Sequence, residues 1–144
     1  MSPAPVSAAI LQWLDPAGGL ASDPGNWIPS QFPNSADHLM FPLSSTYPVT
    51  FNNAVPFAQQ HTYLEGAVTL TMSSPHTTNA LVVGDGNGSS ALVTLTTGQL
   101  TAQAAAVAGS QAGSVGTLTI NDDDATLNAL NQLVIGSSGN GTLN

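Results

Sequence analysis

From about residue 47 onwards, hydrophobic and polar positions alternate in short runs that recur along the chain. Four runs share the pattern x-Thr-Leu-Thr, or a close variant, at residues 68–71, 93–96, 116–120 and 141–144. Their leucines are separated by 25, 23 and 25 residues. Alternation with a period of two is typical of a β-strand with one buried face. Each run therefore predicts a short strand whose leucine points into a core.

Two further strand types recur between these runs. The second type ends in glycine, at residues 81–84, 106–109 and 133–136, and the third, weaker type covers residues 99–101 and 125–127. Turns rich in Gly, Ser and Asn lead from the second type into the next Thr-Leu-Thr run, at residues 85–90, 110–115 and 137–140. Three short strands in each coil of roughly 25 residues predict an all-β fold, a right-handed parallel β-helix or β-solenoid.

Stacking gives this pattern its physical reason, because one coil alone cannot bury its inward side chains. Coils stacked at about 4.8 Å bring equivalent residues together. We expect one inward column and an outward array of paired threonines; the column is Leu70, Leu95, Leu118 and Leu143, and the pairs are Thr69/Thr71, Thr94/Thr96 and Thr117/Thr119. A β-sandwich also shows alternation but does not require a constant spacing, so the solenoid is favoured.

The first third of the chain has a different pattern. Residues 1–46 contain both tryptophans, Trp13 and Trp27, among closely spaced Pro, Gly, Asn and Asp residues. Large apolar side chains set among turns predict a loop-rich N-terminal cap together with the first strands. We therefore expect residues 1–46 to form this cap and residues 47–144 to form the repeats of one continuous domain. Stacking of the tryptophans on sugar rings is the alternative.

The charge composition excludes several functions. The 144 residues include no Lys, Arg or Cys and eight Asp plus Glu, which gives a net charge of −8. Contacts with phosphate need basic side chains, so we expect no nucleic-acid partner. Schiff-base, P-loop and thiol chemistry are excluded as well. Apolar stretches are too short to insert into a membrane, and residues 1–10 lack the basic region of a signal peptide.

Carboxylates are the remaining candidates for catalysis or metal binding. Asp122, Asp123 and Asp124 would supply the two acids of a glycosidase, but they follow Asn121 where a turn is expected. The segment 85–88, Asp-Gly-Asn-Gly, resembles the start of a calcium loop but lacks a later bidentate acid. The equivalent turns contain no aspartate. We therefore expect no catalytic residue, no metal site and no cofactor.

The histidines and the threonine pairs are two further candidates for a functional site. His38, His61 and His76 show no i, i+2 or i, i+4 pairing, so we expect isolated surface or half-buried side chains rather than a metal site. Stacked Thr-x-Thr pairs would form a flat array similar to that of ice-binding solenoids, with three complete rungs and a fourth broken by Asn144. Threonine is also an ordinary outward residue of a β-strand.

Several motifs resemble exported bacterial β-solenoid repeat proteins, namely autotransporter passengers and surface proteins sorted by the PEP-CTERM system. The resemblance rests on Trp13-x-Asp15-Pro16-Ala17-Gly18-Gly19, on Asp23-Pro24-Gly25-Asn26-Trp27, on Pro33-x-x-Ala36-Asp37-x-x-x-Phe41 and on the Val-Gly-x-Gly and Gly-Thr-Leu-Thr repeats. It implies a β-helix at the cell surface or outside the cell, capped at its N-terminus.

These observations predict a non-enzymatic extracellular module with a structural or adhesive role, such as a spacer, a stalk or a self-assembling filament subunit. We expect Leu118 and Ile135 to lack a covering coil, so the expected partner is another copy of the chain or further repeats of a longer chain. The alternatives are an enzyme that acts on polysaccharides through its acidic residues and an ice-binding solenoid.

Overall fold

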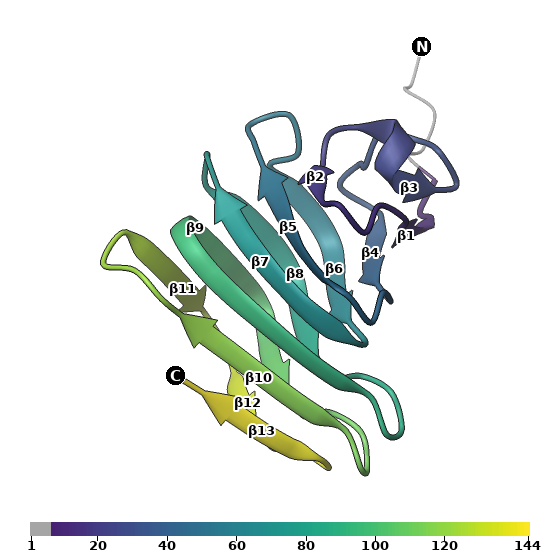
Figure 1. Cartoon of the computed structure of the whole chain (residues 1–144). Coiled ribbons are helices and arrows are strands. Elements are labelled where there is room, and N and C mark those ends of the chain that lie inside the picture. The colour runs from purple at the N-terminus through teal and green to yellow at the C-terminus, as the bar shows by residue number, and fades with distance from the viewer. Residues whose placement is uncertain (1–6) are drawn as a thin grey trace.

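The computed structural model describes residues 7–144, and these are mostly β-strands wound into a parallel β-solenoid of about 5 turns (Figure 1). Sheet A contains β1 (Ile10–Trp13), β4 (His38–Phe41), β6 (Phe57–Tyr63), β8 (His76–Val83), the C-terminal half of β9 (Ser90–Ala108), β11 (Ala125–Ala129) and β12 (Leu133–Ile135). Sheet B contains β2 (Gly19–Leu20), β5 (Thr46–Phe51), β7 (Gly66–Met72), the N-terminal half of β9, β10 (Val115–Ile120) and β13 (Asn140–Leu143). Neighbouring strands of these sheets run parallel, which confirms the predicted β-solenoid.

The three predicted strand types occupy successive segments of each coil. The Thr-Leu-Thr strands form sheet B, and the other two types follow one another in sheet A. In the last coil these two are separate strands, β11 and β12. In the preceding coils they join into β8 and into the second half of β9, with a register shift between Thr78 and Ala80 marking the junction.

The stacking interval on sheet B is 25 residues through the later coils. Leu118 lies on Val93 and Leu143 lies on Leu118, whereas Leu95 is paired with Ile120. The expected single column through Leu70, Leu95, Leu118 and Leu143 is therefore wrong, and two inward columns exist instead. Inward positions recur every second residue, so an alignment error of two residues keeps every leucine inward while assigning it to the wrong neighbour.

The interior changes in composition along the solenoid axis. The N-terminal coils bury mainly aromatic side chains, which include Trp13, Trp27, Phe41, Tyr47, Phe51 and Tyr63, each at most 1% exposed. The rings of Phe41 and Tyr63 stack with centroids 4.5 Å apart. The later coils are filled by smaller aliphatic side chains, among them Val93, Leu95, Leu100, Ala102 and Ala106.

Glycine forms the corners where the chain passes from one sheet to the other. Gly98, at the corner inside β9, has a φ of 77°, and Gly109, just after β9, has a φ of 68°. A Cβ atom on Gly109 would lie 2.5 Å from the carbonyl oxygen of Asn140 on the next coil. Both the backbone conformation and the close approach of the next coil therefore require glycine at position 109.

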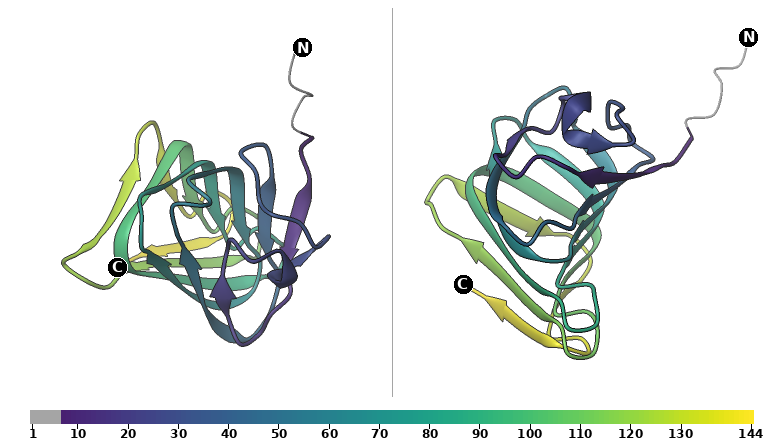
Figure 2. Two further views of the ribbon diagram at one scale, coloured as in Figure 1. Left: turned by 90° about the horizontal axis from the view of Figure 1, so that it is seen from above. Right: turned by 45° about the vertical axis from the view of Figure 1, so that its right-hand side comes forward.

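A cap covers the N-terminal end of the stack, and β13 lies at the opposite end (Figure 2). The cap consists of a 3-10 turn (η1, Pro24–Asn26) and β3 (Trp27–Ile28), which pairs with β1 in antiparallel orientation and ends sheet A. Residues 7–46 also supply β1, β2 and β4 to the two sheets. The expectation about a signal peptide concerns residues 1–10, of which residues 1–6 lie outside the described part of the chain.

Candidate functional site

Most of the carboxylates accept hydrogen bonds from nearby turns. Asp37 is fully buried, and its two oxygens accept from the amides of Ala9 at 2.9 Å and Asn34 at 2.8 Å. Asp15 and Asp23 each accept from an amide two residues ahead, both at 2.8 Å. These side chains hold the cap and its turns in place.

The acidic cluster 122–124 lies in the exposed turn between β10 and β11. The amide of Asp124 donates to a carboxylate oxygen of Asp122 at 3.4 Å, and the amide of Ala125 donates to the carbonyl oxygen of Asp122 at 3.0 Å. The carbonyl oxygen of Asp124 accepts from the amide of Gly98 on the preceding coil at 3.0 Å. The cluster has the contacts of a turn that stacks on the coil before it.

Asp85, the first residue of the calcium-loop-like segment, contacts the next coil. Its carboxylate accepts a hydrogen bond from the hydroxyl of Ser110 and a longer one, 3.5 Å, from the side-chain amide of Gln111. The turns at 85–89 and 110–114 share one further contact, since a serine hydroxyl accepts from the amide three residues before it in each. Asp85 therefore links two equivalent turns.

The two tryptophans have the structural role expected of cap anchors. Their ring centroids lie 4.9 Å apart in an edge-to-face arrangement, and each ring is 1% exposed. The indole N–H groups of Trp13 and Trp27 donate to the carbonyl oxygens of Asp15 and Ala21 at 2.7 and 2.8 Å. Rings buried in this way present no face on which a sugar can stack.

The histidines differ from the sequence expectation. His61 and His76 are buried next to each other, with their Nε2 atoms 3.0 Å apart, so the expectation that the histidines are isolated is wrong for this pair. Parallel stacking places both on consecutive strands of sheet A, where both point inward, and no short-range sequence spacing reveals this. His38 is half-buried on the outer side of sheet A and its Nε2 lies 2.7 Å from the hydroxyl of Thr62. Burial lowers the pKa of His38 against an opposing effect of Asp85.

The outward face of sheet B does not carry the expected array of threonine pairs. Thr69, Thr94 and Thr119 form one continuous column, but Thr117 lies on Leu92 rather than on a threonine. The expected rungs are wrong for the same reason as the leucine column, because the alignment is shifted by two residues. Leu92, which is 37% exposed, interrupts the flat hydroxyl surface that an ice-binding face requires.

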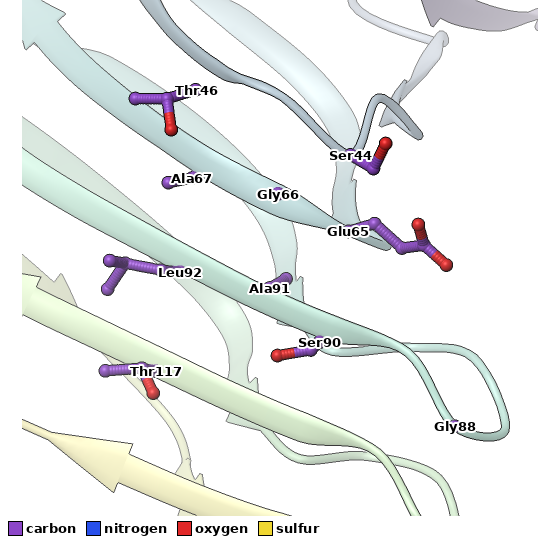
Figure 3. Close-up of a pocket in the computed structure, with 10 residues that line it drawn as sticks. All are labelled: Ser44, Thr46, Glu65, Gly66, Ala67, Gly88, Ser90, Ala91, Leu92 and Thr117. Carbon is purple, nitrogen blue, oxygen red and sulfur yellow. The ribbon is translucent and has the colours of Figure 1, made fainter.

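A shallow groove of about 510 Å³ lies on the outside of sheet B, near the N-terminal ends of its strands (Figure 3). Its floor consists of the small residues Gly66, Ala67 and Ala91 on β7 and β9, and hydroxyls of Ser44, Thr46, Ser90 and Thr117 lie along it. Glu65 supplies its one carboxylate. A groove with a single acid lacks the pair of facing carboxylates that glycoside hydrolysis requires.

The C-terminal end of the solenoid is open. Inward positions of the last coil are exposed there, with Leu133 at 44%, Ile135 at 39% and Leu143 at 42%. Ile135 is 39% exposed within the described residues, and the expectation that Leu118 lacks a cover is wrong, because Leu143 lies on it and leaves it 2% exposed. Among residues 7–144, β13 pairs with β10 alone, so its other edge carries backbone groups unpaired within this part of the chain.

Comparisons with known proteins give no family model, no curated protein and no solved structure that matches the chain. Within residues 7–144, no group of three or more His, Asp or Glu side chains is arranged to hold a metal ion. The same part of the chain has no helix long and apolar enough to cross a membrane. The class of protein, a capped parallel β-solenoid, therefore follows from the topology alone.

Proposed function

We propose that the protein is a non-enzymatic structural or adhesive module that works outside the cell and extends by stacking at its open end. The observation that carries this proposal is the exposure of Leu133, Ile135 and Leu143, which are inward residues of the last described coil. Low charge, the absence of cysteine and the resemblance to exported bacterial solenoids support a location at the cell surface.

The geometry of the open end favours one kind of occupant, another β-solenoid coil. Leu143 continues the column of Val93 and Leu118, and Ile135 continues the column of Val83 and Ala108. Only a coil with the same cross-section extends these columns and pairs with the edges of both sheets at once. Further repeats of a longer chain and a second copy both offer such a coil.

The absence of catalysis is supported by how the acids are used. Asp15, Asp23, Asp37 and Asp85 accept hydrogen bonds that hold turns, and the acids at 122–124 lie in a stacked turn. The sequence offers no Lys or Arg to stabilise a developing negative charge.

Stacking by a second copy is tested by light scattering after size exclusion and by negative-stain electron microscopy at micromolar concentration. We expect the 144-residue chain to associate and the double variant Leu133→Asp/Leu143→Asp to be monomeric, because charges replace the apolar end. Leu92→Asp is the control, since Leu92 is similarly exposed but lies on the outer face. A wild-type chain that is monomeric up to millimolar concentration would exclude stacking by copies.

A further inference from the structure

The interior of the N-terminal coils contains three polar side chains that are linked in a chain of hydrogen bonds. The hydroxyl of Tyr63 lies 3.1 Å from Nδ1 of His61, and Nε2 of His61 lies 3.0 Å from Nε2 of His76. Nδ1 of His76 lies 2.6 Å from the carbonyl oxygen of Val55. Tyr63 and His61 are 0% exposed and His76 is 1% exposed. None of these residues belongs to the cap or to the open end.

The carbonyl at one end fixes the direction of every hydrogen bond in this relay. A carbonyl oxygen only accepts, so Nδ1 of His76 carries the hydrogen and Nε2 of neutral His76 is an acceptor. Nε2 of His61 must then donate to it, which leaves Nδ1 of neutral His61 to accept from the hydroxyl of Tyr63. With both imidazoles neutral, every hydrogen of the relay has an acceptor.

One added proton reverses two hydrogen bonds of the relay, and a second removes the bond between the two imidazoles. With a proton on Nε2 of His76, this atom donates to His61, and the hydrogen of His61 moves to Nδ1. The hydroxyl of Tyr63 then becomes an acceptor and its own hydrogen loses its partner. A second proton places two N–H groups against each other at the 3.0 Å contact. The first step therefore adds a buried charge and leaves the hydroxyl hydrogen of Tyr63 without an acceptor, and the second adds another charge and removes the hydrogen bond between the imidazoles.

The surroundings offer no compensation for such a charge. The ring centroid of Phe51 lies 5.1 Å from that of His61 and 4.4 Å from that of His76. The titratable groups near the pair are Tyr63 on the same strand, Tyr47 on β5 and His38 on β4. Burial first, and then the charges of His76 and His38, hold the pKa of His61 well below its ordinary value. Burial lowers the pKa of His76 to about 4, against an opposing effect of its hydrogen bond to Val55.

We propose that the Tyr63–His61–His76 relay is an acid-sensitive switch that loosens the N-terminal coils below neutral pH. The C-terminal coils are expected to stay folded, because the buried side chains from Val93 to Leu118 in the described chain include no titratable group. Acid thus acts on the capped half of the solenoid and leaves the stacked half in place.

The thermal midpoint as a function of pH tests the switch. The folded pair resists protonation while the unfolded chain binds protons near pH 6.5, so stability is complete above pH 6.5 and falls as the pH drops. We expect the wild-type midpoint to fall by roughly 4–8 °C between pH 7.5 and pH 5.0. In His61→Leu/His76→Leu this fall should disappear, because the two groups that bind protons in the unfolded chain are gone. A leucine side chain fits at both positions, since Leu39 and Leu81 lie beside His61 and Leu100 lies beside His76 on the neighbouring strands.

His38→Gln is the matched control, and it should keep most of the pH dependence, because His38 is only half-buried on the outer side of sheet A and Asp85 opposes the effect of burial on its pKa. A double variant that loses as much stability on acidification as the wild type would overturn the proposal. Should the double variant not fold, imidazole ¹⁵N shifts of the wild-type protein decide the matter. They should show His76 neutral with its hydrogen on Nδ1 from pH 7.5 to pH 5.0, and titration of both rings near pH 6.5 would refute the switch.

Discussion

Leu95 lies against Ile120, 25 residues further along the chain, and not against the leucine of the next Thr-Leu-Thr motif. The pair belongs to a column that begins at Val49 and continues through Leu70. Leu118, the leucine that the motif suggests, belongs to the neighbouring column with Val68 and Val93. The interior of the solenoid is therefore organised by the hydrogen-bonded register of sheet B and not by the position of the motif within each coil.

Truncation of Leu95 should be severe, because its side chain is 1% exposed between two coils. We expect Leu95→Ala to lower the free energy of unfolding by about 2–5 kcal/mol, the cost of lost apolar burial and of the cavity left behind. Leu92→Ala, on the outer face three residues earlier, should change it by less than about 0.5 kcal/mol. Urea denaturation followed by circular dichroism measures both, and equal effects would contradict the assigned faces.

The carboxylate of Asp37 should be a main determinant of cap stability. Asp37→Asn keeps one oxygen and turns an amide donor toward a backbone N–H, so one of the amides of Ala9 and Asn34 loses its acceptor. A buried donor without a partner costs about 1–3 kcal/mol. Asp23→Asn is the control, because Asp23 is exposed and accepts through one oxygen only. Tryptophan fluorescence during denaturation reports on the cap, and a larger effect at Asp23 would refute this role for Asp37.

Removing the hydroxyl of Tyr47 should leave the protein as stable or make it more stable. This hydroxyl is buried without a hydrogen-bond partner, so Tyr47→Phe removes an unsatisfied group and gains about 0–2 kcal/mol at pH 7. Tyr63→Phe, which deletes the bond to His61, should destabilise the protein by about 1 kcal/mol. Denaturant midpoints compare the two variants, and a clear loss in Tyr47→Phe would show that the hydroxyl has a partner.

Alkaline pH should destabilise the protein through the same tyrosines. Burial raises the pKa of Tyr47 and of Tyr63, so the folded chain keeps protons that the unfolded chain releases near pH 10. Stability is complete below pH 10 and is lost as the pH rises beyond it. Thermal midpoints at pH 9, 10 and 11 measure this loss, and Tyr47→Phe should show a smaller one than the wild type. Equal losses in the two proteins would assign alkaline unfolding to other groups.

Two glycines with similar backbone conformations should respond differently to alanine. Gly88 and Gly109 have φ angles of 78° and 68°, so either substitution costs about 1–2 kcal/mol in backbone strain. A Cβ atom at Gly88 meets nothing within 4 Å, whereas at Gly109 it meets the next coil. Gly109→Ala should therefore lower the thermal midpoint by clearly more than Gly88→Ala. Similar midpoints would mean that the last coil moves aside at little cost.

The sequence was sufficient for the class of fold because repeated alternation and corner glycines are local signals. The register, which decides which residues of neighbouring coils pair, cannot be predicted in the same way, because a shift by two residues preserves the inward and outward faces. At positions 116–120, Leu118 and Ile120 both point inward, and only the hydrogen-bonded pairing decides which of them lies on Leu95. The predicted array of threonine pairs is wrong for the same reason.

The buried histidine pair was beyond sequence reasoning for a related cause. His61 and His76 are 15 residues apart, which matches neither the coil length nor a helical spacing. They meet in the interior from consecutive strands of sheet A, with the Ala58–Thr78 pair between them in register. The sequence pattern predicts no strand at residue 61 or residue 76, so it assigns neither histidine to an inward face. The tryptophan cap was easier to predict, because large apolar side chains among turns have few other places to pack.

The stacking of coils also sets how the chain would respond to tension. A coil is held by hydrogen bonds to its neighbours, and the last coil has a neighbour on one side only. Under a pulling force this coil should detach first and the remaining ones should follow in sequence. The interval between stacked residues is 20 residues from β6 to β8 and 27 from β9 to β11, so extension should proceed in discrete steps of unequal length, roughly 65–100 Å of extended chain each, and the aromatic coils beneath the cap should be the last to give way.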